Sequence, residues 1–344
     1  MIFKKINGVF LLFSLSLFLG GCESPQRVNR FTGQTMGTFY TVSIDAPDMD
    51  EAHRLQIHDS IDSVLHAINK QMNLWDPESE ISHFNQMSSD DTLTISSDFA
   101  RVIHLSKTIW ETSKGAFDPT VGPLVDLWGF GAGSTEKKVP DSLEIARCLE
   151  YVGFDLIGFD ENKLYKKDSR VHLDLAAIAK GYGVDAVADY LKNRGFENCL
   201  VEIGGEVYAS GTVKGRPWRL GIERPVDNAM PGDAINLIIS VSNQGVATSG
   251  DYRNYYIHEG RRISHTLDPK TGYPVNHILS SATIIAPTCA EADAIATACI
   301  VLGEDAFPWV ETLPSIEGYF LFRKDSESFQ EKMSSGFHHY IVEK

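Results

Sequence analysis

The sequence predicts an α+β fold built as one domain, and three observations support this prediction. Stretches that alternate like β-strands and stretches with helical spacing of apolar residues are intermixed along the 344 residues, without a regular βαβ rhythm. No segment has the composition of a linker, and no tandem repeat or low-complexity tract is found. An expected leader (residues 1–21) and tether (residues 22–30) leave residues 31–344. That length suffices for one large core or two fused lobes, and the missing linker favours one domain.

The first residues have the layout of a secretory signal. Lys4 and Lys5 precede a short apolar stretch, Val9–Leu19, and small residues follow just before Cys22. The apolar stretch is shorter than a membrane-spanning helix. The sequence LGGC, which ends at Cys22, resembles a bacterial lipobox and implies cleavage before this cysteine and lipidation of its thiol. An ordinary signal peptide with a chance cysteine is the alternative.

The charge of the chain limits its partners. The formal net charge is −15, and the expected leader contains two lysines and no acids, so the mature chain would be more acidic still. Such a body argues against nucleic acid or anionic lipid as a partner, and any hold on the membrane should come from a lipid on Cys22. We therefore expect an exported, lipid-anchored protein at the inner membrane, facing the periplasm. A polyanionic ligand would need a metal ion or helix N-termini to bind.

Four cysteines follow the expected lipidation site. None of them forms a CxxC pair, and although an exported compartment permits disulfides, the spacing predicts no pairing. Buried free thiols are therefore expected at Cys148, Cys199, Cys289 and Cys299.

The first half of the chain is expected to begin with one strand and to continue mainly as helices. Residues 35–44 (TMGTFYTVSI) alternate and are rich in β-branched residues, which is typical of a strand. Apolar residues then keep helical spacing over residues 50–72 and again over residues 97–115. A loop or short helical turn and a further capped helix are expected at residues 117–134 and 140–153.

The second half is richer in strands. Residues 163–175 are expected to form a hairpin that leads into a helix over residues 177–194. A second helix covers residues 291–303 and ends at a glycine. The remaining strands are expected at residues 199–205, 206–211, 218–223, 235–242, 255–267, 281–286, 318–323 and 338–342.

The helix over residues 291–303 carries an unusual pair of polar residues. Asp293 and Thr297 are four residues apart, so they share one stripe of an otherwise small and apolar helix. A buried carboxylate needs a partner, because leaving it uncompensated is too costly. Mg²⁺ fits a carboxylate and a hydroxyl, and completes its coordination with water and substrate phosphates. A salt bridge to an arginine is the alternative.

Three other stretches offer candidate site residues. Asp174 and Lys180 lie at a strand-to-helix junction rich in small residues, where a ligand can approach the backbone and a helix N-terminus favours anions. The alternative is a helix cap and a solvated lysine. His265 and Asp268 lie three apart in a loop rich in turn residues, where function is often found. Asp118 could cap a helix or bind a ligand.

Eight motifs, in this order, resemble those of the ApbE family, the FAD:protein FMN transferases. The resemblance extends from about residue 32 to residue 303, and it implies an ApbE-type α+β catalytic domain. It also implies a Mg²⁺-dependent transfer of the FMN half of FAD to a threonine of a target flavoprotein, through a phosphoester bond and with release of AMP. The motifs are QTMGTFYTV, MNLWDPESEISHFN, GAFDPTVGPLVDLWGFG, LDLAAIAKGYGVDAVADYL, VEIGGEVYASG, GVATSGDYRNYY, RRISHTLDPKTGYPV and EADAIATA.

The resemblance also assigns roles to individual residues. His265 matches the family's candidate proton acceptor, with Asp268 beside it as a second catalytic candidate. Trp75 stands where the family usually has an aromatic residue, often Tyr, against the flavin; tryptophan keeps the stacking surface but changes the hydrogen-bonding tip. The metal site maps to Asp293 and Thr297, with the backbone of Ala177 and Ala296 nearby, and the FAD contacts map to Met36, Ala116, Phe117, Asp118, Asp174, Lys180 and Leu267.

The chemistry of the implied reaction suits these residues. A threonine hydroxyl is a poor nucleophile at neutral pH, so a base such as His265 helps it to attack. A metal ion on the pyrophosphate neutralises its charge and orients the leaving AMP. Two alternatives remain open from the sequence: a Mg²⁺-dependent FAD pyrophosphatase that yields FMN and AMP, and a non-enzymatic flavin-binding lipoprotein.

Overall fold

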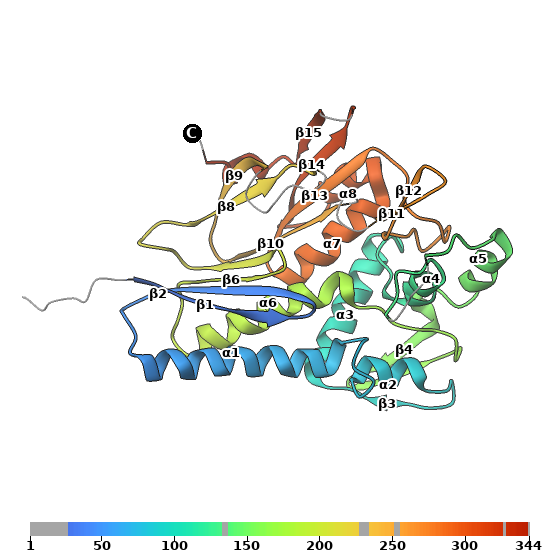
Figure 1. The fold of residues 1–344 in the computed structure, drawn as a ribbon, viewed down its shortest axis with the longest axis horizontal. Coiled ribbons are helices and arrows are strands. Elements are labelled where there is room, and N and C mark those ends of the chain that lie inside the picture. Colours follow the sequence, from blue (N-terminus) through green and yellow to red (C-terminus); the bar gives the residue numbers. More distant parts are fainter. Residues whose placement is uncertain (1–26, 133–136, 227–233, 251–254, 326–327, 343–344) are drawn as a thin grey trace, which may run out of the picture.

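The computed structural model describes residues 27–132, 137–226, 234–250, 255–325 and 328–342, and its centre is one eight-stranded antiparallel sheet. The strand order is β1-β2-β6-β7-β10-β13-β14-β15, so strands from both ends of the chain share one sheet (Figure 1). This architecture confirms the predicted α+β class. The strands are β1 (Arg27–Thr35), β2 (Thr38–Ala46), β6 (Cys199–Ile203), β7 (Glu206–Ser210), β10 (Gln244–Gly250), β13 (Leu279–Ala286), β14 (Glu317–Arg323) and β15 (Phe329–Met333).

Two central helices connect the sheet to an outer helical layer. Helix α6 (Ala176–Asn193) packs on β6 and β7, α7 (Cys289–Leu302) packs on β10 and β13, and the two helices contact each other (Figure 1). Helices α1 (Glu51–Met72) and α3 (Ser97–Thr112) cover α6 from the side away from the sheet. The helices predicted over residues 50–72, 97–115, 177–194 and 291–303 are thus confirmed, with ends shifted by a few residues.

The two central helices approach each other closely, and glycine makes this possible. A Cβ atom at Gly181 of α6 would lie 2.4 Å from the carbonyl oxygen of Cys289, and one at Gly245 of β10 would lie 2.3 Å from the Cys289 nitrogen. Asp185 of α6 then closes the contact, because its carboxylate accepts hydrogen bonds from the N–H groups of Cys289 and Ala290, each at 2.8 Å. This contact between helices fixes the position of α7 relative to α6.

Smaller elements surround this core. They are α2 (Glu80–Gln86), α4 (Gly122–Leu127), α5 (Ser142–Leu149), α8 (Ala306–Val310), β3 (Leu93–Thr94), β4 (Ile157–Asp160), β5 (Lys163–Lys166), β8 (Trp218–Glu223), β9 (Ile235–Val241), β11 (Tyr255–His258) and β12 (Arg261–Ser264). Within the described ranges, every helix is too short or too polar to cross a membrane. The four cysteines expected as buried free thiols are buried and unpaired, as predicted.

The N-terminal prediction is corrected in two ways. The single strand expected over residues 35–44 is a hairpin, because Met36 and Gly37 form a turn between β1 and β2. Both residues have positive φ, 49° and 72°, as a two-residue hairpin turn requires. Strand β1 also begins at Arg27, so the tether expected over residues 22–30 is wrong for its last four positions. Cys22 and the leader lie outside the described residues.

Two strand predictions in the second half are also wrong. The expected hairpin over residues 163–175 contains one strand, β5, which pairs with β3 and β4 instead. The segment after β5 does not fold back as a second strand. It is held by the buried ammonium group of Lys166, which donates to the carbonyl oxygens of Val171 and Asn85. The strand expected over residues 338–342 is largely a 3₁₀ helix, Phe337–Tyr340.

Candidate functional site

A cavity of about 430 Å³ lies where the N-terminal turn of α6 faces α7 and the end of β10. A neighbouring cavity of about 660 Å³ extends toward the C-terminal end of α1 and shares Trp75, Asp174, Lys180 and His265 with the first. The two cavities are therefore adjacent. Of the residues predicted for the site, the first cavity is lined by Trp75, Ala116, Phe117, Asp118, Asp174, Ala177, Lys180, His265, Leu267, Asp293 and Thr297, and the second adds Met36.

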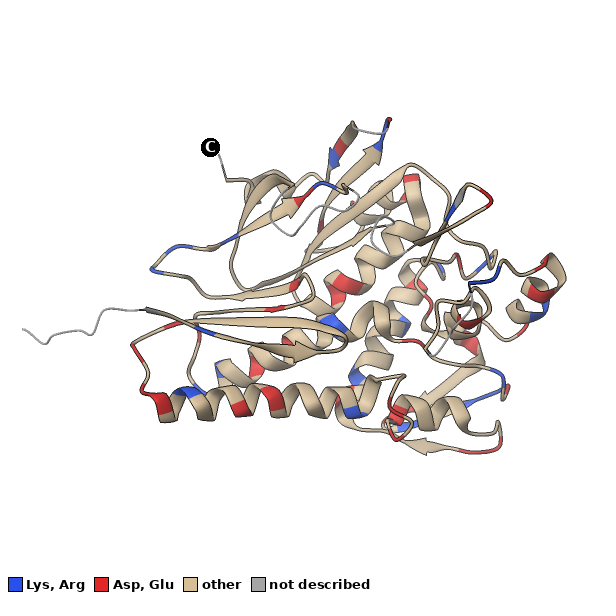
Figure 2. Ribbon diagram, viewed as in Figure 1, with Lys and Arg blue, Asp and Glu red and all other residues tan. Residues whose placement is uncertain are grey.

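Three charged side chains that line the first cavity, those of Lys180, Glu206 and Asp293, form its charged centre. The ammonium group of Lys180 lies 3.2 Å from Oε1 of Glu206 and 3.6 Å from Oδ2 of Asp293. Both carboxylates are buried, with Asp293 2% and Glu206 6% exposed. Lys180 of α6 thus faces Asp293 of α7. Figure 2 shows a segment of α6 coloured for Lys or Arg beside a segment of α7 coloured for Asp or Glu. Among the described residues, the ion-pair partner of Asp293 is a lysine, not the arginine considered from the sequence.

Burial and charge act in opposite directions on this group. Burial raises the pKa of Glu206 to about 7, although the charge of Lys180 pulls it down. Burial by itself lowers the pKa of Lys180, but Asp293 and Glu206 outweigh this effect and the pKa is raised above its ordinary value. The lysine is therefore held as an ammonium ion in a cavity where two acids compete for it.

The Asp293–Thr297 pair lies on one face of α7, and that face lines the cavity. Oδ2 of Asp293 accepts a hydrogen bond from the N–H of Gly181 at 3.1 Å, and the hydroxyl of Thr297 lies 3.2 Å from the hydroxyl of Ser249 on β10. Hard oxygen donors of this kind fit Mg²⁺. No group of three or more His, Cys, Asp and Glu residues that could hold a metal occurs within the described ranges.

The two alanines predicted beside the metal are placed differently. Ala177, in the first turn of α6, lines the cavity as expected. Ala296, between Asp293 and Thr297, is fully buried in the main hydrophobic core and is not part of the cavity lining. Ala177 therefore faces the space in which the ion is expected, whereas the side chain of Ala296 packs in the core.

The loop after β12 places His265 at the cavity, whereas the side chain of Asp268 makes hydrogen bonds within the loop itself. Oδ1 of Asp268 accepts from the N–H of Lys270 at 2.9 Å, and Oδ2 accepts from the hydroxyl of Thr271 at 3.0 Å. The Asp268 backbone also pairs with Tyr273 and Gly272. Its carboxylate thus closes a turn, which is the usual use of aspartate before proline. The catalytic role predicted for Asp268 is not supported, whereas His265 and Leu267 do line the cavity.

Asp118 and Asp174 fix the backbone that surrounds the ligand space. The carboxylate of Asp118 accepts from the N–H and hydroxyl of Thr120, from the indole N–H of Trp110 and from the N–H of Phe154. Asp174 accepts from the N–H of Ala176, the first residue of α6, at 2.8 Å and so fixes the backbone where the helix begins. Burial raises the pKa of both carboxyls, against the effect of these donors.

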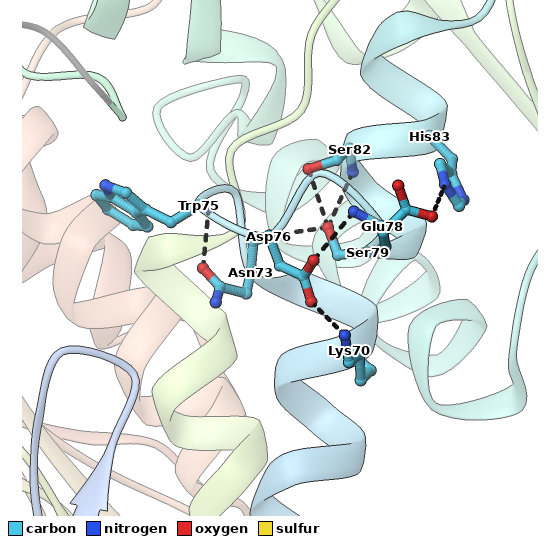
Figure 3. Close-up of polar contacts among 8 residues, drawn as sticks. All are labelled: Lys70, Asn73, Trp75, Asp76, Glu78, Ser79, Ser82 and His83. Carbon is cyan, nitrogen blue, oxygen red and sulfur yellow. Dashed lines mark hydrogen bonds and ion pairs between the residues drawn. The ribbon is translucent and has the colours of Figure 1, made fainter.

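The turn between α1 and α2 presents an aromatic ring to the same space. Trp75 is 71% exposed and lines both parts of the cavity. The turn is held in place around it, since the Trp75 N–H donates to Oδ1 of Asn73 and the Lys70 ammonium pairs with Asp76 at 2.8 Å. Figure 3 shows the indole pointing away from these contacts. The ring is therefore available for stacking on a planar ligand.

Sequence reasoning missed Glu206. This residue begins β7, directly after the tight turn of Gly204 and Gly205 that joins β6 to β7, and it points across to α6. The available signal was an acid placed directly after two glycines at the start of a strand. Only the packing of α6 on β7 reveals that its partner is Lys180.

Known proteins resemble this chain in both sequence and structure. A family model described as "ApbE family" matches residues 36–320. An FAD:protein FMN transferase from Haemophilus influenzae is 38% identical over 97% of both chains, and one from Escherichia coli K12 is 33% identical over 96% of both. Among solved structures, the flavin transferase ApbE from Vibrio cholerae has a TM-score of 0.82 and 34% identity, and covers 92% of this chain and 100% of its own. The apo form of the Pseudomonas stutzeri flavinyl transferase ApbE gives 0.81 and 33%, with 92% and 97% covered.

Proposed function

The chain belongs to the ApbE family and is an FAD:protein FMN transferase, and on this premise we propose that its reaction depends on Mg²⁺ and that its acceptor is a threonine. The observation that carries this proposal is the Asp293–Thr297 face of α7, which lies in the same cavity as His265 and Lys180. A metal-binding edge, a candidate base and a fixed cation around one space suit the transfer of a phosphoryl group.

The residues that would hold Mg²⁺ are the carboxylate of Asp293 and the hydroxyl of Thr297, with Ala177 beside them. When bound, Mg²⁺ supplies charge neutralisation for the pyrophosphate and for the phosphate that leaves with AMP. Lys180 adds a fixed positive charge at the same place. The ring of Trp75 stacks on the flavin and so orients the FMN half of FAD.

His265 acts as the base in this proposal. An imidazole nitrogen takes the proton of the threonine hydroxyl while the threonine oxygen forms a bond to the phosphorus of the FMN half. The bond between this phosphorus and the bridging oxygen breaks, and its electron pair leaves with AMP. The products are AMP and a protein that carries FMN through a phosphoester of threonine.

The proposal is tested with purified protein, FAD, Mg²⁺ and an acceptor protein or peptide that contains a candidate threonine. Mass spectrometry should detect the added FMN on the acceptor, and chromatography should detect an equal amount of AMP. Excess EDTA, or replacement of the acceptor threonine by alanine, should prevent both. Free FMN formed at a similar rate without acceptor would instead indicate a pyrophosphatase that uses water as the nucleophile.

We also propose that the mature protein is exported and anchored by a lipid on Cys22, because a lipobox-like LGGC sequence follows a basic and then apolar leader. Expression in cells that receive a labelled fatty acid should give a labelled protein in the membrane fraction. Cys22→Ser should abolish the label and release the protein from the membrane. Equal labelling of the Cys22→Ser protein would contradict the anchor.

A further inference from the structure

Glu206 has no role in the reaction described above, yet it lines the cavity beside Lys180. It is 6% exposed, and its Oε2 atom has no hydrogen-bond partner within the described part of the chain. Burying a carboxylate is costly unless its surroundings compensate for it. The compensation comes from Lys180, whose ammonium group lies 3.2 Å from Oε1 of Glu206.

Lys180 is shared, because it also lies 3.6 Å from Oδ2 of Asp293, the main candidate ligand of the metal. The ammonium group of Lys180 therefore compensates the negative charge of Asp293 in this structure. A divalent ion bound by Asp293 would be a second positive charge close to the ammonium group of Lys180. The two cations repel each other, so one acid is needed to hold the lysine when the other binds the metal.

We propose that Lys180 is a resident counter-ion of Asp293 and that Glu206 is a positioning residue that holds Lys180 when Mg²⁺ enters with FAD. This inference rests on the proposed function, since it concerns the same Mg²⁺. In effect, the Lys180–Glu206 pair makes the binding of metal and nucleotide depend on each other.

The dependence follows from the charges. With both acids ionised, the three side chains carry one negative charge in excess. Mg²⁺ alone makes the centre positive, and the pyrophosphate of FAD alone makes it strongly negative, whereas the two together restore the original excess of one negative charge. Each ligand is therefore bound best in the presence of the other, and the coupling is reciprocal.

Two charge-removing substitutions should shift this balance in opposite directions. Glu206→Gln makes the centre more positive, so Mg²⁺ alone should bind about tenfold more weakly and FAD without metal about tenfold more tightly. Lys180→Met makes it more negative, so the same two affinities should change by similar factors in the opposite sense. A purely structural role would weaken both kinds of binding in both variants.

The experiment uses the whole protein at pH 8, where Glu206 is expected to be ionised. Calorimetry measures Mg²⁺ binding without nucleotide, and equilibrium dialysis measures FAD binding in EDTA and in Mg²⁺. The double variant Lys180→Met/Glu206→Gln regains the original net charge, so its affinity for Mg²⁺ alone should return to within about threefold of the wild type. Lys192→Met is the matched control, because this lysine is on the same helix but pairs with Asp189 at the surface.

The outcomes separate this inference from the proposed function. If Mg²⁺ tightens FAD binding to the wild type and the two single variants move in opposite directions, the inference is supported. If Mg²⁺ tightens FAD binding but both single variants change in the same direction, or neither changes, the counter-ion role is wrong and the proposed function stands. If Mg²⁺ has no effect on FAD binding to the wild type, both are overturned.

Discussion

Replacing Asp293 by asparagine is expected to lower the rate of FMN transfer by on the order of 10³-fold, which corresponds to about 4 kcal/mol of transition-state stabilisation. Asparagine keeps the shape of the side chain and an oxygen that can accept the hydrogen bond from Gly181. It removes the charge that a divalent ion requires. Because the fold should be retained, the loss would report on the metal and not on packing.

The measurement is the rate of transfer as a function of Mg²⁺ concentration, alongside the thermal unfolding of each protein. Asp293→Asn should show no saturation by Mg²⁺ in the range that saturates the wild type. Glu291→Gln is the matched control, because Glu291 is an acid on the same helix that contacts the Thr288 hydroxyl and does not line the cavity. A wild-type response to Mg²⁺ in Asp293→Asn would remove this face of α7 from the reaction.

The helices were predictable because their signals are local. The stretch over residues 291–303 contains small and apolar residues up to Gly303, and the structure ends α7 there with a positive φ at that glycine. The same periodicity placed Asp293 and Thr297 on one face, which the cavity confirms. A helix repeat is a property of neighbouring residues and needs no knowledge of the fold.

The strands were less predictable because their partners are distant in the sequence. Strand β10 was not predicted, since QGVATSG has glycines at positions 2 and 7 and no alternation of apolar and polar residues between them. It forms because it lies between β7 and β13, and its Gly245 allows close contact with the start of α7. The requirement for glycine there comes from α7, about forty residues later in the chain.

The same distinction applies to the site. Asp268 appeared to be a catalytic partner because it is near His265 in the sequence, but its side chain is engaged by Lys270 and Thr271 within its own turn. Glu206 lies far from Lys180 in the sequence and was missed, although it is within 3.2 Å of the Lys180 ammonium. Distance along the chain is a poor guide to which charges meet in a cavity.

Replacing His265 by alanine is expected to lower the rate of transfer by about 10²- to 10⁴-fold, the usual contribution of a general base. FAD binding in the presence of Mg²⁺ should change much less, because the base acts on the threonine and not on the nucleotide. The acid limb of the pH–rate profile that a histidine base produces should disappear in the variant. Added imidazole should restore part of the rate, since the shortened side chain leaves space in the cavity.

Asp268→Ala serves as the comparison for this result. Because its carboxylate closes the turn that follows His265, this change should lower the melting temperature, while the pH–rate profile keeps its acid limb. If His265→Ala kept the acid limb and did not respond to imidazole, His265 would be a structural residue and another group would accept the proton. If Asp268→Ala instead removed the acid limb without loss of stability, the carboxylate would act together with His265 in proton transfer, contrary to the geometry of its turn.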